Sequence, residues 1–115
     1  LKHLPHGLTV GLVLAECLEV IRPDCADRLE RVADALGEPA DGTADGSRAV
    51  RAVRRLLAAA AFPTLGEVGV SDADVDVLTE LALTEQAFFF TVDCHAWTRD
   101  EVAGAYRAAL AVTAR

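Results

Sequence analysis

The feature that most constrains the fold is a long apolar segment near the start of the chain, from Leu8 to Ile21. A helix that is apolar around most of its circumference is normally buried by elements on several sides. Pro5 suits the first turn of such a helix, because that position needs no backbone N–H. We therefore predict a central buried helix from about Pro5 to Val20. Its few polar side chains fall along one narrow stripe at helical spacing: Thr9, Glu16 and Glu19.

The remainder of the chain shows helical rather than strand periodicity, so the predicted fold class is all-α. We expect a second helix between an N-cap at Asp24 and a C-cap at Gly37, since Pro23 should end the first one. Its inward side chains would be Cys25, Leu29, Val32 and Leu36. Further helices are predicted over about 47–61, 72–85 and 98–112. The last two begin with capping-box pairs, Ser71 with Asp74 and Thr98 with Glu101.

Three smaller features give expectations that a structure can test. Gly7 and Gly11 lie one helical turn apart and would leave a groove for another backbone or a flat ligand. The aromatic run Phe88–Phe90 should plug a gap between helices. A basic stripe on the helix over 47–61 should be a solvated face that pairs with carboxylates, and the alternative is attraction of a cofactor phosphate. Its members are Arg48, Arg51, Arg54 and Arg55.

Length and composition indicate one domain that is part of something larger. A chain of 115 residues has single-domain length, yet 52% of its residues are hydrophobic. A domain of this size cannot easily bury that much aliphatic surface, and we expect some of it to face a partner. The chain contains no methionine and starts only five residues before His6. We interpret it as the C-terminal piece of a longer protein.

Charge and cysteine usage exclude some partners and suggest a compartment. The net charge of −7 argues against nucleic acid and against acidic membrane surfaces. Glu16 and Glu19 interrupt the longest apolar run, and nothing resembles a signal peptide. The three cysteines (Cys17, Cys25 and Cys94) are an odd number without a CxxC pair. We therefore expect reduced thiols in a cytoplasmic protein.

His6 is the candidate metal ligand. At a helix start the positive end of the dipole disfavours an imidazolium, and a neutral ring is the form that binds a metal. Capping or packing is the commoner use of a lone histidine in this position. His3 forms a His-x-x-His pair with His6, but Pro5 indicates that His3 precedes the helix, and we interpret it as a bystander.

Pro5-His6-Gly7 followed by an apolar helix resembles the segment that carries the last metal-binding histidine of iron-containing (group III) alcohol dehydrogenases. The resemblance continues in order through Ala35-Leu36-Gly37, the turn at 63–70 and the acidic helix start at 71–75. It covers essentially the whole chain. It implies the C-terminal helical domain of the dehydroquinate synthase-like / iron-containing alcohol dehydrogenase fold, spanning residues 1–115, with the N-terminal nucleotide-binding domain absent.

The resemblance also implies chemistry. His6 would be one of four ligands of Fe²⁺ or Zn²⁺, and the Asp and two His residues of the family's set have no counterpart here. NAD or NADP would bind mainly to the missing domain. The intact enzyme would interconvert an alcohol and an aldehyde or keto compound by hydride transfer; relatives act on simple alcohols, phosphonoacetaldehyde or maleylacetate. A homodimer is possible, because dimers are common among relatives, and this piece alone should be inactive.

One stretch departs from the family pattern. Where relatives have an Asn-Pro-Arg-like sequence before the last helix, this chain has Val92–Trp97. The family's loop lies near the active-site cleft, which makes Cys94 and His95 candidate substrate-proximal residues. The alternative is a surface loop whose Trp97 packs on the final helix. An alternative function also stays open: a stand-alone helical protein-interaction module that kept the scaffold without catalysis.

Overall fold

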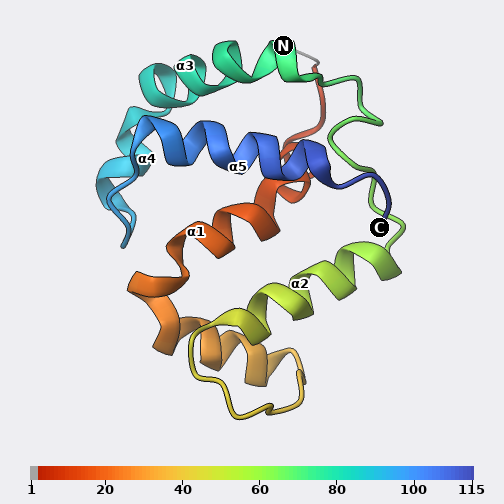
Figure 1. Ribbon diagram of the computed structural model, residues 1–115, viewed down its shortest axis with the longest axis vertical. Coiled ribbons are helices and arrows are strands. Elements are labelled where there is room, and N and C mark those ends of the chain that lie inside the picture. Colours follow the sequence, from red (N-terminus) through yellow and green to blue (C-terminus); the bar gives the residue numbers. More distant parts are fainter. Residues whose placement is uncertain (1–2) are drawn as a thin grey trace.

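The computed structural model describes residues 3–115, and all regular structure within that range is helical (Figure 1). The prediction of an all-α fold is confirmed. No helix in the described range is both long enough and apolar enough to cross a membrane. The elements in chain order are α1 (His6–Ala35), α2 (Ser47–Ala59), the 3₁₀ turn η1 (Asp72–Asp74), α3 (Val75–Glu85), α4 (Ala87–Val92) and α5 (Arg99–Ala111).

The apolar helix α1 is the centre of the arrangement. It packs against both α2 and α5, while α3 lies on the outer side of α5 (Figure 1). Leu12 and Ala15, in its first half, are 1% and 0% exposed. The prediction of a central buried helix is therefore confirmed for this half. Two small cores result. The first half of α1 packs against α5 and the turn after α2. The second half of α1 packs against α2.

The predicted division into two helical segments is present as a kink, but its position is wrong: the break falls at Cys25 and not before Pro23. Cys25 has non-helical backbone angles (φ −129°, ψ 19°), and the helix resumes beyond it to Ala35. Proline lacks the N–H that would bond one turn back, and here the lost bond gives a kink rather than an end. Asp24, predicted as an N-cap, directs its carboxylate to His95 instead.

Beyond the kink, the predicted buried side of α1 is confirmed at Cys25 and Leu29 and is wrong at Val32 and Leu36. Leu29 and Ala33 pack against Ala49 of α2. Val32 and Leu36, predicted to face inward, are 41% and 39% exposed. The change at Cys25 rotates the second half of the helix relative to the first, and a regular extrapolation of the periodicity cannot follow it.

Several turn and cap predictions are confirmed. Gly37 ends α1 in a left-handed conformation (φ 72°), and the next N–H, of Glu38, donates to the Ala33 carbonyl at 3.0 Å. Both predicted capping boxes are present, at Ser71 before η1 and at Thr98 before α5. Helices η1 and α3 together span the predicted 72–85, and α5 ends one residue before the predicted position.

The groove predicted at the glycines is filled at one of them by a flat side chain. The ring of Phe62, just after α2, lies so close to Gly11 that an added Cβ would come within 2.4 Å of Phe62 Cζ. Gly7 has open space around it. The close approach at Gly11 thus belongs to the protein's own packing between α1 and the turn after α2.

The aromatic run does not plug a gap, and that prediction is wrong. It forms the short helix α4, which contacts α3, and Phe88 and Phe89 are 69% and 64% exposed. Phe90 alone turns inward and meets Trp97 edge to face, with ring centroids 6.0 Å apart. A six-residue helix buries only one side, so its other aromatic side chains stay at the surface.

The basic stripe on α2 pairs with carboxylates as predicted, but it is not uniformly solvated. Arg48 is 6% exposed and donates to Glu30 (2.7 Å) and Asp34 (2.9 Å) on α1. Arg51 and Arg55, at the surface, pair with Asp41 and Glu38 of the loop between the helices. The prediction of a solvated face is therefore wrong for Arg48.

Candidate functional site

His6 is the first residue of α1 and is exposed. Its backbone is held by the helix start: the Pro5 carbonyl accepts bonds from the Thr9 N–H at 3.0 Å and the Thr9 hydroxyl at 3.2 Å. Leu12, one helical turn after Thr9, is buried in the core shared with α5. A histidine in this place is presented to solvent by a rigid element, which is the support that a ligand residue needs.

The chain by itself supplies one donor here. Among residues 3–115 no group of three or more His, Cys, Asp or Glu side chains is arranged to hold a metal ion. His3 lies before the start of α1, so it does not share a helical face with His6. A catalytic metal needs three or four protein donors. A metal bound at His6 would therefore need further donors beyond those that residues 3–115 group together.

A shallow apolar cavity of about 270 Å³ lies beside the start of α1. His3 and Thr9 are on its rim, and Tyr106 of α5 forms part of its wall. Burial raises the pKa of the Tyr106 hydroxyl, with a smaller contribution from Cys17. The remaining wall is aliphatic, from Leu4, Leu12, Val13, Leu65, Val70 and Leu78.

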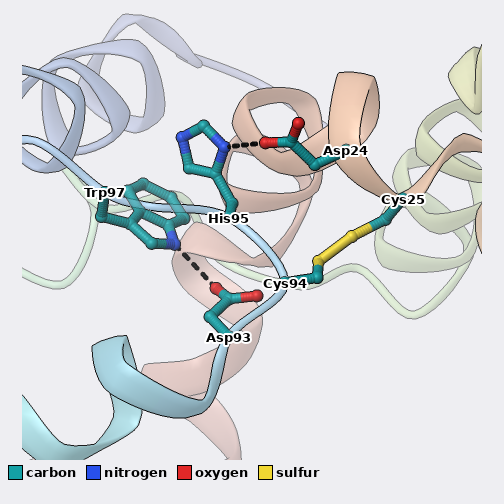
Figure 2. The surroundings of a disulfide bond; sticks show 6 residues. All are labelled: Asp24, Cys25, Asp93, Cys94, His95 and Trp97. Atoms are coloured by element: carbon teal, nitrogen blue, oxygen red, sulfur yellow. Dashed lines mark hydrogen bonds and ion pairs between the residues drawn. A yellow bond between two sulfur atoms is a disulfide. The ribbon is translucent and has the colours of Figure 1, made fainter.

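The second candidate, the loop before α5, is covalently attached to α1. Cys94 forms a disulfide with Cys25, with 6.7 Å between their Cα atoms (Figure 2). The prediction of reduced thiols is wrong for Cys25 and Cys94. The cysteine pattern therefore does not indicate a reducing compartment. Cys17 is free and half-buried, and burial together with the nearby Glu16 and Asp93 carboxylates raises its pKa to about 11. That thiol is inert at neutral pH.

The His95 ring lies between two carboxylates. Nδ1 is 2.5 Å from Asp24 Oδ2 at the α1 kink, and Nε2 is 2.6 Å from Glu101 Oε2 in the first turn of α5 (Figure 2 shows the Asp24 contact). These bonds raise the pKa of His95, that to Asp24 contributing most. The bond from His95, followed by that from the Thr98 N–H, lowers the pKa of Glu101. The ring is therefore favoured as an imidazolium that donates from both nitrogens, and in that form it has no lone pair for a metal.

Trp97 completes this cluster. Its indole Nε1 donates to Asp93 Oδ2 at 2.7 Å, and its ring meets His95 edge to face, with centroids 5.5 Å apart (Figure 2). It lines a small cavity together with Val102 and Tyr106 of α5. These contacts agree with the alternative in which Trp97 packs on the final helix. In the structure, Cys94 and His95 attach the loop before α5 to the kink of α1. Their proximity to a substrate stays a prediction.

The disulfide and the His95 contacts were not visible to sequence reasoning. Cys25 and Cys94 are 69 residues apart in the chain, and Asp24 and His95 are 71 residues apart. The adjacency of Asp24 and Cys25 on one side, and of Cys94 and His95 on the other, is the signal that was available. In each pair a cysteine is adjacent to a residue of opposite charge to that in the other pair, so the two segments can be joined by a disulfide and by an ion pair.

The fold defines the class of protein first: a helical domain built around one long kinked helix that presents a histidine at its exposed start. The sequence matches the family model described as Fe-containing alcohol dehydrogenase family, C-terminal, over residues 2–110. The chain therefore belongs to the iron-containing alcohol dehydrogenase family and corresponds to its C-terminal domain.

A solved structure supports the fold. An archaeal halo-thermophilic alcohol dehydrogenase from a Red Sea brine pool superposes with a TM-score of 0.82 and 22% sequence identity over 93% of this chain. The match covers 28% of that enzyme's chain, so this chain spans well under half of its length. The comparison with curated proteins found no match.

Proposed function

We propose that this chain is the C-terminal domain of a metal-dependent, NAD(P)-linked alcohol dehydrogenase-like oxidoreductase. The intact enzyme would interconvert an alcohol and an aldehyde or keto compound by hydride transfer. The observation that carries the proposal is the family match over residues 2–110, which begins just before the exposed His6 at the start of the buried helix. The small-molecule substrate would bind at the boundary between this domain and an N-terminal nucleotide-binding domain.

His6 has the role of a metal ligand in this proposal. A metal held there would act as a Lewis acid on the substrate oxygen. The contribution of this chain is positional: the buried Leu12 and Ala15 hold α1 in the core, and the Pro5 carbonyl holds its first turn. In the proposal, this support would hold the ring in a fixed position toward donors on a second domain.

The nicotinamide cofactor, NAD or NADP, would bind mainly to that second domain. The length of the archaeal enzyme relative to this chain leaves room for such a domain. The apolar cavity beside the α1 start is the described hollow nearest to His6 in sequence, and it would face the boundary between the two domains. We assign no substrate identity to it.

The experiment is to express the complete reading frame that contains this chain and to measure its metal content and NAD(P)H oxidation. The assay uses a panel of aldehydes and keto acids with added Fe²⁺ or Zn²⁺. We expect His6→Ala to lose bound metal and activity together. His3→Ala is the matched control for metal binding and should retain bound metal, because it removes an imidazole three residues away that precedes the helix.

Two results would count against the proposal. His6→Ala could retain its full metal content, which would remove His6 from the ligand set. The natural product could prove to be this 115-residue chain alone, binding neither iron nor nicotinamide. That second result would favour a stand-alone helical interaction module.

A further inference from the structure

The two ends of the Cys25–Cys94 disulfide differ in their access to solvent. Cys94 is exposed, in the loop of residues 93–98 that joins α4 to α5, whereas Cys25 is 7% exposed. A hollow of about 360 Å³ beside the bond is lined by Cys94 and by residues 23–28 around the kink of α1. A small thiol in this hollow therefore has access to the Cys94 sulfur, while the Cys25 sulfur lies in the folded domain.

The loop 93–98 can leave the kink without the loss of a helical turn. It lies between the end of α4 and the start of α5 and has no regular helix of its own. Trp97 bonds within this loop, to Asp93 at 2.7 Å. When the sulfur atoms separate, the bond between His95 and Asp24 is left to hold the loop on α1. An ion pair at a protein surface contributes little by itself, so the disulfide is the stronger of the two attachments.

We propose that this disulfide is a reversible thiol switch, in which a dithiol reductant reacts at Cys94 and reduction releases the loop 93–98 from α1. Exposed disulfides are the ones that exchange readily with thiols, because the attacking thiolate must reach a sulfur atom. The modification site is separate from His6, and the proposal does not depend on the oxidoreductase function.

The exchange proceeds in two steps and transfers two electrons. A thiolate of the reductant attacks Cys94 Sγ, a mixed disulfide forms, and the bond to Cys25 breaks, so that Cys25 leaves as a thiolate. The second thiolate of the reductant then attacks the reductant's own sulfur in the mixed disulfide, and Cys94 leaves. Each attacking thiol gives its proton to water, and each leaving thiolate takes one. The reductant becomes a cyclic disulfide, and both cysteines become thiols.

The first experiment asks whether the folded protein reacts. Oxidised wild type is mixed with dithiothreitol at constant pH, and free thiols are counted over time by mass spectrometry after alkylation. We expect the rate of reduction to rise in proportion to the dithiothreitol concentration and to change by less than about twofold between no urea and about 1 M urea. Reduction that had to wait for global unfolding would accelerate about tenfold or more per molar urea. That result would overturn the proposal.

A matched pair of variants tests which sulfur reacts. Cys25→Ser leaves the exposed Cys94, and Cys94→Ser leaves the buried Cys25; both lose the same disulfide and keep Cys17. Each variant, with a native circular dichroism spectrum, is treated with bis(2-hydroxyethyl) disulfide, which is small and neutral. We expect Cys94 to form the mixed disulfide at least about tenfold faster than Cys25. Equal rates, or faster reaction of Cys25, would overturn the assignment of Cys94.

Release of the loop has two spectroscopic signals. Trp97 is the only tryptophan of the sequence, so its emission reports on the loop, and we expect a shift to longer wavelength on reduction. The His95 ring lies between Asp24 of α1 and Glu101 of α5, and its pKa, measured by NMR, should fall toward 6.5 as the loop carries it away from Asp24. Cys94→Ser should show both signals without reductant. Failure of either signal to change when the wild type is reduced would overturn the release.

Discussion

The sulfur atoms of Cys25 and Cys94 join the kink of α1 to the loop that precedes α5. Beside this bond, Asp24 and His95 make a second attachment between the same two segments (Figure 2). The kink and the loop are therefore held by one covalent and one charge-assisted contact. Because Cys94 and His95 lie between α4 and α5, the attachment determines how this last part of the chain lies on α1.

Cys94→Ser should lower the free energy of unfolding by about 4 kcal/mol, because the disulfide closes a loop of 69 residues and restricts the unfolded chain. The measurement is urea unfolding followed by far-UV circular dichroism. Dithiothreitol should bring the wild type to the stability of the variant. Cys17→Ser is the control: it keeps the disulfide, so dithiothreitol should lower its stability by the same amount as that of the wild type. A wild type that is unaffected by reductant would contradict the prediction.

The His95 contacts should make stability depend on pH. Asp24 and Glu101 raise the His95 pKa above its ordinary 6.5, so the stabilisation is complete below about pH 6.5 and is lost as the pH rises through the folded value. The free energy of unfolding of wild type and His95→Gln should converge at high pH. Asp24→Asn removes the negative charge of one acceptor and should bring the imidazole pKa, measured by NMR, back toward 6.5. An unchanged imidazole pKa in that variant would refute the assignment.

The Glu101 carboxylate determines the pH below which its contact with His95 stops contributing to stability. His95 and the Thr98 N–H lower its pKa below the ordinary 4.5. Its contribution is therefore complete above about pH 4.5 and is lost as the pH falls through the lowered value. Glu101→Gln should reduce the stability difference between pH 5.5 and acidic pH, as measured by urea unfolding at each pH. A difference equal to that of the wild type would show that the carboxylate is not engaged.

Gly11→Ala and Gly104→Ala form a matched pair with opposite expected signs. Gly11→Ala should destabilise by about 1–3 kcal/mol, because the new methyl meets the Phe62 ring. Gly104→Ala should stabilise by up to about 1 kcal/mol, because an exposed interior position of α5 gains helix propensity and the methyl meets nothing. Thermal unfolding of both proteins measures this. Equal changes in both would show that Phe62 does not lie against α1.

Arg48→Met should destabilise the protein much more than Arg55→Met. Arg48 joins α2 to Glu30 and Asp34 of α1 from a buried position, and its removal leaves acceptors without partners. Arg55 makes its ion pair with Glu38 at the surface, where such pairs contribute little. Chemical unfolding of the two variants decides the matter, and similar losses would mean that burial of Arg48 adds nothing.

Local features were predictable from the sequence because their causes are local. The apolar run that makes α1 central, the Gly37 cap and the capping boxes at Ser71 and Thr98 each depend on residues within one or two turns. The same holds for the placement of His6 at a helix start, which follows from Pro5 and the run behind it. The order of short motifs was enough to indicate the family.

Tertiary packing decided what sequence periodicity could not. Whether Pro23 ends or bends α1 depends on what the second half can pack against, and Ala49 of α2 provides that surface. Arg48 is buried because it donates to Glu30 and Asp34 of α1, which lie 18 and 14 residues away in the chain and come close only when α1 and α2 pack. The Cys25–Cys94 bond and the contact of His95 with Asp24 join segments about 70 residues apart, and no pattern within either segment encodes its partner. The sequence by itself determined the main helices, though not α4, and where His6 stands. The way the helices pack determined which charges are buried and which thiols are joined.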